Sequence, residues 1–506
     1  LDIEGNPTSR TRISRILDKD LLEVWPFPPD AEMTLDISVE VAAFDPPPKP
    51  KGITSRTSPE KVKAKQEQYA AELRTFAQRW DDIRMTRENE IMELAAHYNG
   101  EILELSADGT VEYSDSFSAR IKMSGAGFVD LISNFPSIFE AVLPDNVSQP
   151  FPQSPSEDDD NGDDFELLPP PDGFQSICVV DSGIQENHRW LDAAVDGRWS
   201  HCFIPSKPDD EVADYVEGGG HGTRVAGACL YQSEVPVNGT VEAPFGLINA
   251  RVLDEENSLQ ENIFPARLME EVVRRYAATA GVKIFQHSIA SNRAFRPGRM
   301  SIWASVIDRL SHREEVLFIQ AAGNLVDRAA INAPGIIDHL SAGRSYPGYL
   351  FAKSSRIANP AQSLQALTVG SVSRHYFEDE DRHSIAGPDS PSSFTRSGFG
   401  MWDGIKPEVV EFGGDKAMDS GEPPSLTLPE DVCPTTIRST LQGGPAYARD
   451  DVGTSYAAPQ VTHIAGHLQK LFPEQSPLLY RALIVNSARW PQWAEEAAVE
   501  DRVKIF

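Results

Sequence analysis

A serine in the last part of the chain lies in a sequence that suits a nucleophile. Ser455 belongs to a Gly-Thr-Ser turn that leads into an alanine-rich run, with Pro459 four residues later. Because proline is tolerated in the first turn of a helix, this pattern predicts a helix that begins at Ser455, with the hydroxyl on an exposed turn. The free N–H groups at a helix start favour an oxyanion formed nearby. A serine that merely caps the helix fits the same stretch.

Three other residues could complete the chemistry. Asp181 ends an apolar run in VVDSG, His221 follows three glycines in GGGHGTRVAG, and Asn324 ends an apolar run in IQAAGN. A serine hydroxyl needs a base such as His to take its proton, and a buried Asp can hold that imidazole in one tautomer. An Asn amide can stabilise the oxyanion. Each motif alone fits an ordinary turn or helix start, but the order Asp, His, Ser predicts a catalytic triad.

Alternating strands and helices would position these residues from about residue 174 onward. The expected strands are 176–183, 245–253, 282–290, 316–324 and 366–372, and the expected helices are 221–231, 264–281, 301–313, 455–472 and 478–488. This alternation predicts an α/β fold, a parallel sheet with helices on both faces. Sites in such sheets lie at the carboxyl ends of the strands, where Asp181, Asn324 and Ser288 fall.

The chain before this region has a different order of elements. We expect strands at 35–44, 101–105, 117–123 and 138–144 and helices at 13–25, 59–98 and 127–135. From the first strand onward the order is β, α, β, β, α, β, which predicts a small α+β ferredoxin-like domain. An unrelated α+β domain fits the same pattern.

An acidic, proline-rich stretch separates the two regions. It contains the like-charge run 157–164 and three consecutive prolines at 169–171. Such composition predicts a flexible linker. The expected organisation is therefore an N-terminal extension at 1–30, the ferredoxin-like domain at 31–150, the linker at 151–173 and the α/β domain at 174–506.

Composition restricts the partners and the location. The net charge is -30, with 76 acidic and 46 basic residues, which argues against nucleic acid or an anionic membrane as the main partner. There is no apolar run long enough to span a membrane and no secretory leader, so we expect a cytoplasmic protein. The four cysteines form no CxxC pair, which disfavours a zinc site or a disulfide framework.

Residues 174–490 resemble the subtilases, the subtilisin-like serine peptidases. The stretches that carry the resemblance are VVDSGI (179–184), HGTRVAG (221–227), ARVL (250–253), AAGN (321–324), NPAQSLQALTVGSV (359–372), SSFTRSG (392–398), KPEVV (406–410) and GTSYAAPQVTHIAG (453–466). The resemblance implies a subtilisin-like fold and a serine endopeptidase that hydrolyses peptide bonds through an acyl-enzyme. It implies a triad of Asp181, His221 and Ser455, with Asn324 in the oxyanion hole.

The same resemblance implies where a substrate would bind. The backbone of a peptide or protein substrate would pair with the strand edge at Ser288, Ile289 and Ala290, and such β-addition gives affinity with little side-chain selectivity.

Some positions depart from the family pattern. Arg224 stands where subtilases mostly carry His or Ala, and it could affect the substrate pockets or only the surface. Gln460 replaces a usual His. Trp190 stands where a calcium-ligating Asp is common, so that calcium site is expected to be absent. We expect no metal and no cofactor.

Residues 117–145 resemble the second half of a subtilisin propeptide, although the helix at 59–98 is longer than usual. Those propeptides act as folding chaperones and inhibitors of their own catalytic domain. We therefore hypothesise that residues 31–145 dock on the catalytic domain as an intramolecular inhibitor or chaperone, with 146–173 passing near the active site.

Other functions remain open at this point. The chain could be a pseudopeptidase or binding scaffold that keeps the fold without the chemistry. It could also be a regulatory protease that a partner activates, since some bacterial subtilases of similar domain order are encoded beside an AAA+ ATPase. A sedolisin is disfavoured because His221 is present in an intact HGT, and a metallopeptidase because no HExxH occurs.

Overall fold

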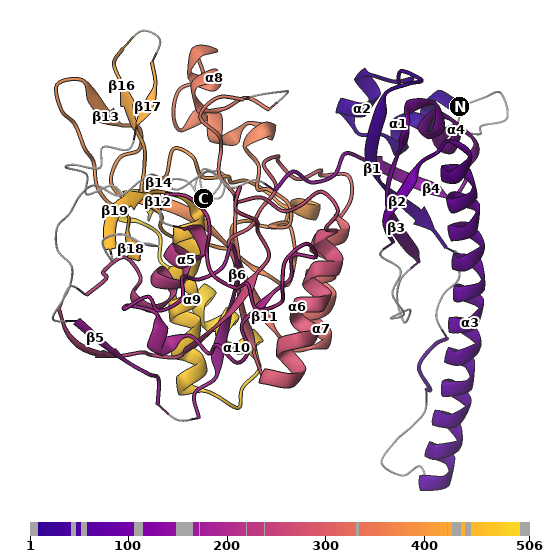
Figure 1. Ribbon diagram of the computed structural model, residues 1–506, viewed down its shortest axis with the longest axis horizontal. Helices are drawn as coiled ribbons and strands as arrows, with labels where there is room; N and C mark the ends of the chain where they lie inside the picture. Colours follow the sequence, from indigo (N-terminus) through magenta and orange to yellow (C-terminus); the bar gives the residue numbers. More distant parts are fainter. Residues whose placement is uncertain are drawn as a thin grey trace. The chain divides into compact units, whose positions relative to one another are not determined.

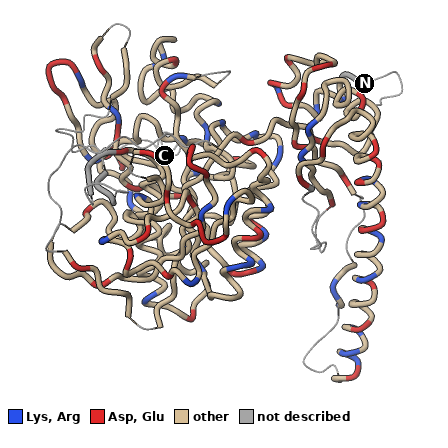
Figure 2. Tube along the Cα trace, in the orientation of Figure 1, with Lys and Arg blue, Asp and Glu red and all other residues tan. Residues whose placement is uncertain are grey.

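The computed structural model describes residues 9–41, 47–51, 58–105, 115–147, 165–171, 173–218, 220–236, 238–329, 333–421, 424–427, 437–440 and 447–495. The chain divides into two compact units, Leu1–Pro144 and Asp145–Phe506 (Figure 1). Asp and Glu residues, which outnumber Lys and Arg by 76 to 46, lie along both units (Figure 2). The acidic run 157–164 of the predicted linker lies outside the described residues.

The first unit is a four-stranded antiparallel sheet with helices. Its elements are α1 (Ser9–Ile16), α2 (Lys19–Glu23), β1 (Glu32–Glu40), α3 (Pro59–His97), β2 (Glu101–Leu105), β3 (Ser116–Ser124), α4 (Gly125–Asn134) and β4 (Ile138–Val142). The strand order is β2-β3-β1-β4. The helix expected at 13–25 is two helices, because Asp18 accepts a hydrogen bond from the N–H of Leu21 and starts a new one.

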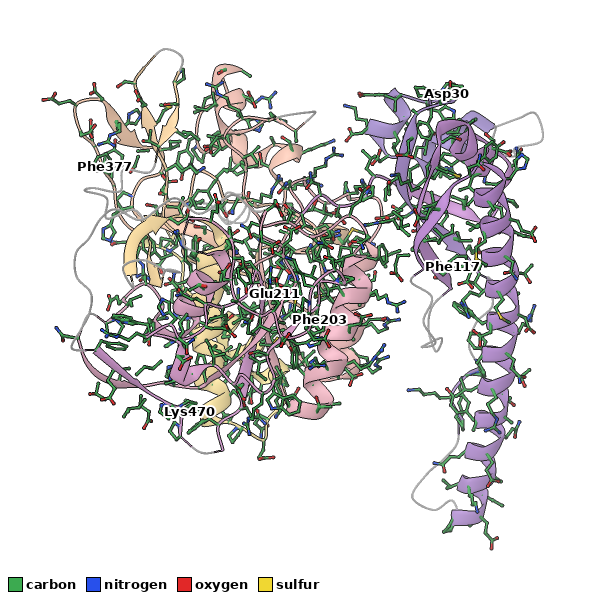
Figure 3. All side chains as sticks on the ribbon, in the orientation of Figure 1. Asp30, Phe117, Phe203, Glu211, Phe377 and Lys470 are labelled. Carbon is green, nitrogen blue, oxygen red and sulfur yellow. The ribbon has the colours of Figure 1, made fainter. Side chains whose placement is uncertain are left out.

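The sheet of the first unit buries apolar side chains against the helices of that unit. On β3, Phe117 (Figure 3) and Ile121 are buried. They belong to one cluster with Phe128 of α4. From α3 the same cluster takes Trp80 and Ile91, which both lie in the second half of this 39-residue helix. The packing of α3 therefore concentrates toward its C-terminal end.

The second unit contains an eight-stranded, mostly parallel sheet. Its strands are β6 (Ser176–Asp181), β7 (His201–Cys202), β9 (Gly246–Arg251), β10 (Ile284–His287), β11 (Leu317–Ala321), β12 (Leu367–Ser373), β14 (Ser390–Pro391) and β15 (Val409–Phe412). The order is β14-β12-β11-β10-β6-β9-β7, and β15 also pairs with β12. Only the β12–β14 pairing is antiparallel among these strands. This sheet confirms the predicted α/β class.

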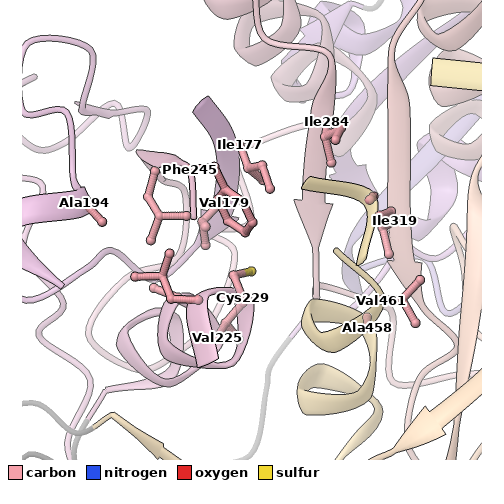
Figure 4. Close-up of a cluster of buried hydrophobic side chains, with 14 of the residues drawn as sticks. Ile177, Val179, Ala194, Val225, Cys229, Phe245, Ile284, Ile319, Ala458 and Val461 are labelled. Carbon is pink, nitrogen blue, oxygen red and sulfur yellow. The ribbon is translucent and has the colours of Figure 1, made fainter. Parts of the chain in front are cut away.

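Helices cover both faces of this sheet. The helices of the unit are α5 (His221–Tyr231), α6 (Pro265–Ala280), α7 (Ile302–Arg313), α8 (Ile336–Ser341), α9 (Thr454–Leu471), α10 (Pro477–Ser487) and α11 (Gln492–Glu495). Because successive strand residues point to opposite faces, Ile177 and Val179 of β6 pack with α5 and α9 (Figure 4). Cys178 and Val180 pack on the other face with α6 and α7.

The remaining elements lie outside the main sheet. They are β5 (Phe165–Leu168) paired with β8 (Gly239–Glu242), β13 (Arg382–Ser384) with β16 (Ala417–Asp419) and β17 (Leu426–Thr427), and β18 (Ile437–Thr440) with β19 (Tyr447–Asp451). There are also 3-10 helices at Asp192–Ala194, Gly348–Phe351, Lys353–Ser355 and Met401–Asp403. None of the described helices combines the length and apolar character that crossing a membrane requires.

Strand β5 differs from the expected flexible linker. Composition placed residues 165–168 in the linker, but Phe165 and Leu167 are buried and alternate with the exposed residues Glu166 and Leu168. Phe165 stacks on the ring of Trp190, with 4.7 Å between ring centroids. The alternation of buried and exposed residues, and not the preceding acidic run, is what characterises the structure of this short segment.

Candidate active site

The four predicted residues lie at the ends of elements of the second unit. Asp181 is the last residue of β6, His221 is the first of α5, and Asn324 follows the end of β11 by three residues. Ser455 is the second residue of α9, whose N-cap is Gly453. The hydroxyl of Ser455 therefore does not cap the helix. Its side chain is buried, and the expectation of an exposed turn was wrong, because the first turns of α9 pack inside the unit.

The imidazole of His221 is held by a short hydrogen bond. Its Nδ1 lies 2.6 Å from Oδ1 of Asp181, and both side chains are buried. Since a carboxylate only accepts, Nδ1 carries the proton and Nε2 is left as the basic nitrogen. Burial lowers the pKa of His221, but the charge and hydrogen bond of Asp181, with the charges of Asp214 and Asp451, raise the pKa above its ordinary value overall.

Asp214 supports this pair, and the sequence analysis did not single it out. Its carboxylate accepts from the N–H of Thr223 at 2.9 Å and from the hydroxyl of Ser182 at 3.0 Å. The Ser182 hydroxyl in turn accepts from the N–H of Gly222 at 2.8 Å. The N-cap of α5 is Gly220, which has no side chain, so Asp214 performs the capping from outside the helix. Three consecutive glycines before a helix indicate that its first N–H groups need a cap from elsewhere in the chain, but they do not indicate which residue supplies it.

A glycine allows the start of α5 to approach the end of β6. A Cβ on Gly222 would overlap the main-chain oxygen of Gly183 and touch Cβ of Asp181. Only glycine therefore permits the helix to begin this close to the turn after Asp181. The close approach is what brings His221 within hydrogen-bonding distance of Asp181.

The amide of Asn324 is oriented by the residue before Ser455. Its Oδ1 accepts from the N–H of Thr454 at 3.0 Å and from the Thr454 hydroxyl at 2.9 Å. These bonds identify the oxygen end of the amide and leave the NH2 group as a donor. They also tie the loop after β11 to the start of α9.

The predicted substrate-binding residues lie directly beside Ser455. Residues 288–290 follow the end of β10. The Ser455 hydroxyl donates to the main-chain oxygen of Ser288 at 3.4 Å, and the Ser288 hydroxyl donates to the main-chain oxygen of Ser455 at 3.0 Å. Ile289 and Ala290 are buried. In this structure the Ser455 hydroxyl thus contacts Ser288 and not His221, although α5 and α9 belong to one packed cluster.

No group of three or more His, Cys, Asp or Glu side chains is arranged to hold a metal ion in the part of the chain that the structure describes. Trp190, at the position where a calcium-ligating Asp is common in the family, is a buried core residue whose indole N–H donates to the main-chain oxygen of Pro236. The three described cysteines, at 178, 202 and 229, are buried free thiols.

Comparison with known families agrees with the motifs. Residues 174–503 match the family model of the Subtilase family (Peptidase_S8). The chain belongs to the subtilase family. The predicted resemblance is thereby confirmed, and membership in the subtilases supports the class of serine protease.

Similar individual proteins were also found. The curated "Uncharacterized protein y4bN" of Sinorhizobium fredii (strain NBRC 101917 / NGR234) is 32% identical over 247 residues, which cover 45% of this subtilase and 53% of that protein. The chain thus spans about half the length of the curated relative it matches.

Among solved structures, "Crystal structure of a cold adapted subtilisin-like serine proteinase" is similar at 20% identity, with 65% of this subtilase and 90% of that chain covered and a TM-score of 0.40. "S41 Psychrophilic Protease" is similar at 19% identity (65% and 84% covered, TM-score 0.40), as is "Sphericase" (19% identity, 64% and 84% covered, TM-score 0.40).

Proposed function

We propose that this subtilase is a serine endopeptidase with Ser455 as nucleophile, His221 as general base and Asp181 as the residue that orients the base. The observation that carries the proposal is the buried 2.6 Å hydrogen bond between His221 and Asp181, which leaves Nε2 of the imidazole free to accept a proton. A pseudopeptidase would have no need of this buried carboxylate and imidazole, since burying a carboxylate carries a desolvation cost.

The reaction follows from this arrangement. The Ser455 hydroxyl turns from the Ser288 oxygen toward Nε2 of His221, loses its proton to it, and attacks the carbonyl carbon of the scissile peptide bond. The NH2 group of Asn324 and a free N–H at the start of α9 stabilise the resulting oxyanion. His221 then gives the proton to the leaving amine. Water, activated by the same base, hydrolyses the acyl-enzyme and regenerates Ser455.

A covalent probe tests this proposal. We would measure the intact mass before and after treatment with a fluorophosphonate, beside a Ser455→Ala control. We expect one adduct on the wild type and none on the control. A wild type that stays unlabelled, both as purified and after proteolysis between residues 148 and 164, would identify the chain as a scaffold.

Asn324→Ala is expected to lower kcat by about 10²–10³-fold with little change in KM, because the lost donor acts only on the oxyanion. Steady-state kinetics on a peptide substrate measure both values. Thr454→Val is the matched control: it removes one bond that orients the Asn324 amide but keeps the amide itself, so its loss should be smaller. An unchanged kcat in Asn324→Ala would exclude an oxyanion role.

We also propose that this peptidase is held latent by the chain that follows its first unit. Residues 145–147 belong to the second unit and are bonded to two of its segments, one of which lies two positions after the predicted substrate-binding residues 288–290. The N–H of Asn292 donates to the oxygen of Asn146 at 3.0 Å, and the N–H of Leu259 donates to the oxygen of Val147 at 2.9 Å. Consecutive carbonyls thus accept from two different segments, a pattern that a strand added between two neighbours would also show.

Side chains also hold this segment. Val147 is 2% exposed and belongs to the same apolar cluster as Ile289. The Asp145 carboxylate accepts a hydrogen bond from the amide of Asn359. A peptide that pairs with residues 288–290 and continues past Asn292 would meet residues 145–147, which supports a segment that competes with substrate.

Val147→Asp is expected to increase the initial rate on a short peptide substrate by about tenfold. Losing the burial of one valine costs about 1.5–3 kcal/mol, and about 1.4 kcal/mol corresponds to a tenfold shift in occupancy. The control is Val24→Asp, which makes the same change at a side chain that is 54% exposed in the first unit and should leave the rate unchanged. Equal rates for both variants and the wild type would contradict latency.

A further inference from the structure

We propose that Arg224, Asp451 and Tyr456 form a positioning network that holds the turn containing Ser455 against the helix containing His221. The inference rests on the proposed peptidase function and concerns residues beyond the triad. Sequence left open whether Arg224 affects the substrate pockets or only the surface. In the structure the Arg224 side chain is buried, and it reaches from α5 to Asp451 of β19.

Arg224 lies one turn after His221 on α5. Its side chain is 0% exposed, and its guanidinium lies 3.3 Å from Oδ2 of Asp451. The other terminal nitrogen donates to the main-chain oxygen of Gly218, just before the helix. A buried cation needs such partners, because an unpaired one would be strongly destabilising. The rigid, planar guanidinium therefore connects the base-bearing helix to Asp451.

Asp451 also accepts two hydrogen bonds from the turn that contains Ser455. Its Oδ1 accepts from the N–H of Val452 at 2.8 Å, and its Oδ2 accepts from the hydroxyl of Tyr456 at 2.7 Å. Ser455 lies between these two contacts in the sequence. The side chains thus close residues 451–456 into a loop, and Arg224 fixes that loop to α5.

The network also reaches the base itself. The rings of Tyr456 and His221 have centroids 6.1 Å apart, and the Asp451 charge is one of those that raise the pKa of His221. A displacement of about 1 Å between nucleophile and base can cost about 10²-fold in rate. A network that ties the two elements together therefore acts on the rate more than on substrate affinity.

Tyr456→Phe is the decisive variant, because it removes one hydroxyl and keeps the ring. We expect kcat and the rate constant of fluorophosphonate labelling to fall about tenfold, with KM and Tm near the wild-type values. The matched control is Tyr480→Phe on α10, which removes a hydroxyl that donates to the main-chain oxygen of Phe472, the C-cap of α9, and should keep the wild-type labelling rate.

A pH profile separates positioning from electrostatics. The charged groups that face His221 are Asp181 from β6, Asp214 from the loop before α5, and Asp451 from β19, which is paired with Arg224. Asp451→Asn should move the acid limb of the labelling rate to lower pH, since a charge that raises the pKa is removed. Tyr456→Phe should lower the plateau and leave the limb in place.

The outcomes are distinguishable. Two results for Tyr456→Phe would overturn the positioning network while the proposed function stands. One is a labelling rate within twofold of a reactive wild type. The other is an acid limb that shifts while the plateau of the labelling rate stays unchanged. A wild type that takes no probe overturns both. Arg224→Lys keeps the charge but loses the planar guanidinium. Its labelling rate should therefore lie between that of the wild type and that of folded Arg224→Met.

Discussion

Ser455→Ala should lower kcat by about 10⁶-fold on a peptide substrate, and adding His221→Ala to it should lower kcat no further. In the proposed mechanism the two side chains act as one unit: the base has no function without the hydroxyl, and the hydroxyl is a poor nucleophile without the base. Steady-state rates of the single and double variants measure this non-additivity. Tm should stay close to the wild-type value, because Ser455 caps no helix end.

The control for this prediction is a serine that does cap a helix. Ser476 is the N-cap of α10, and its hydroxyl accepts from the N–H of Leu478. Ser476→Ala should cost about 1 kcal/mol of stability and leave kcat unchanged. If Ser455→Ala behaved like Ser476→Ala, with lower stability and full activity, Ser455 would be a structural residue and the endopeptidase proposal would fail.

Asp181→Asn should lower kcat by about 10⁴-fold while the geometry is retained. An Asn amide that donates to Nδ1 of His221 would move the ring proton to Nε2, and Nε2, the proposed acceptor for the Ser455 proton, could then no longer accept it. The same change removes the charge that most raises the pKa of His221, so burial dominates and the pKa falls. We therefore expect a much lower plateau and an acid limb at lower pH in the kcat/KM profile.

Asp415→Asn is the matched control for Asp181→Asn. Asp415 is also buried, and burial raises the pKa of its carboxyl, but it bonds to the N–H groups of Ala386 and Ser393 and not to His221. Asp415→Asn should change the free energy of unfolding and leave the pH profile of kcat/KM unchanged. Equal kcat values for Asp181→Asn and the wild type would mean that His221 needs no orienting carboxylate.

Local sequence was sufficient for the central strands and the long helices of the two units. Apolar residues three and four apart predicted α6, and short apolar runs predicted β6, β10 and β11 to within a few residues. These signals are local, because a strand or helix buries one face that its own residues define. The helix at 13–25 and the linker residues 165–168 were exceptions: a single cap at Asp18 divides the helix, and the linker residues form β5.

The sequence by itself determined the α/β fold class and the positions of Asp181, His221, Asn324 and Ser455 at element ends. Each of these residues follows or begins an element whose pattern is local. The sequence did not identify Asp214, Asp451 or Tyr456. Only the tertiary structure shows that an acidic loop residue caps α5 from outside and that Arg224 pairs with Asp451, 227 positions away.

Only the tertiary structure also placed residues 145–147 against Asn292, two positions after the predicted substrate-binding residues 288–290. Residues 145–147 have no motif, and their bonds to Asn292 and Leu259 depend on a sheet assembled from distant segments. Which residue pairs with a buried charge or a main-chain N–H group depends on which distant segment of the chain lies beside it. Composition and periodicity carry no information on that placement.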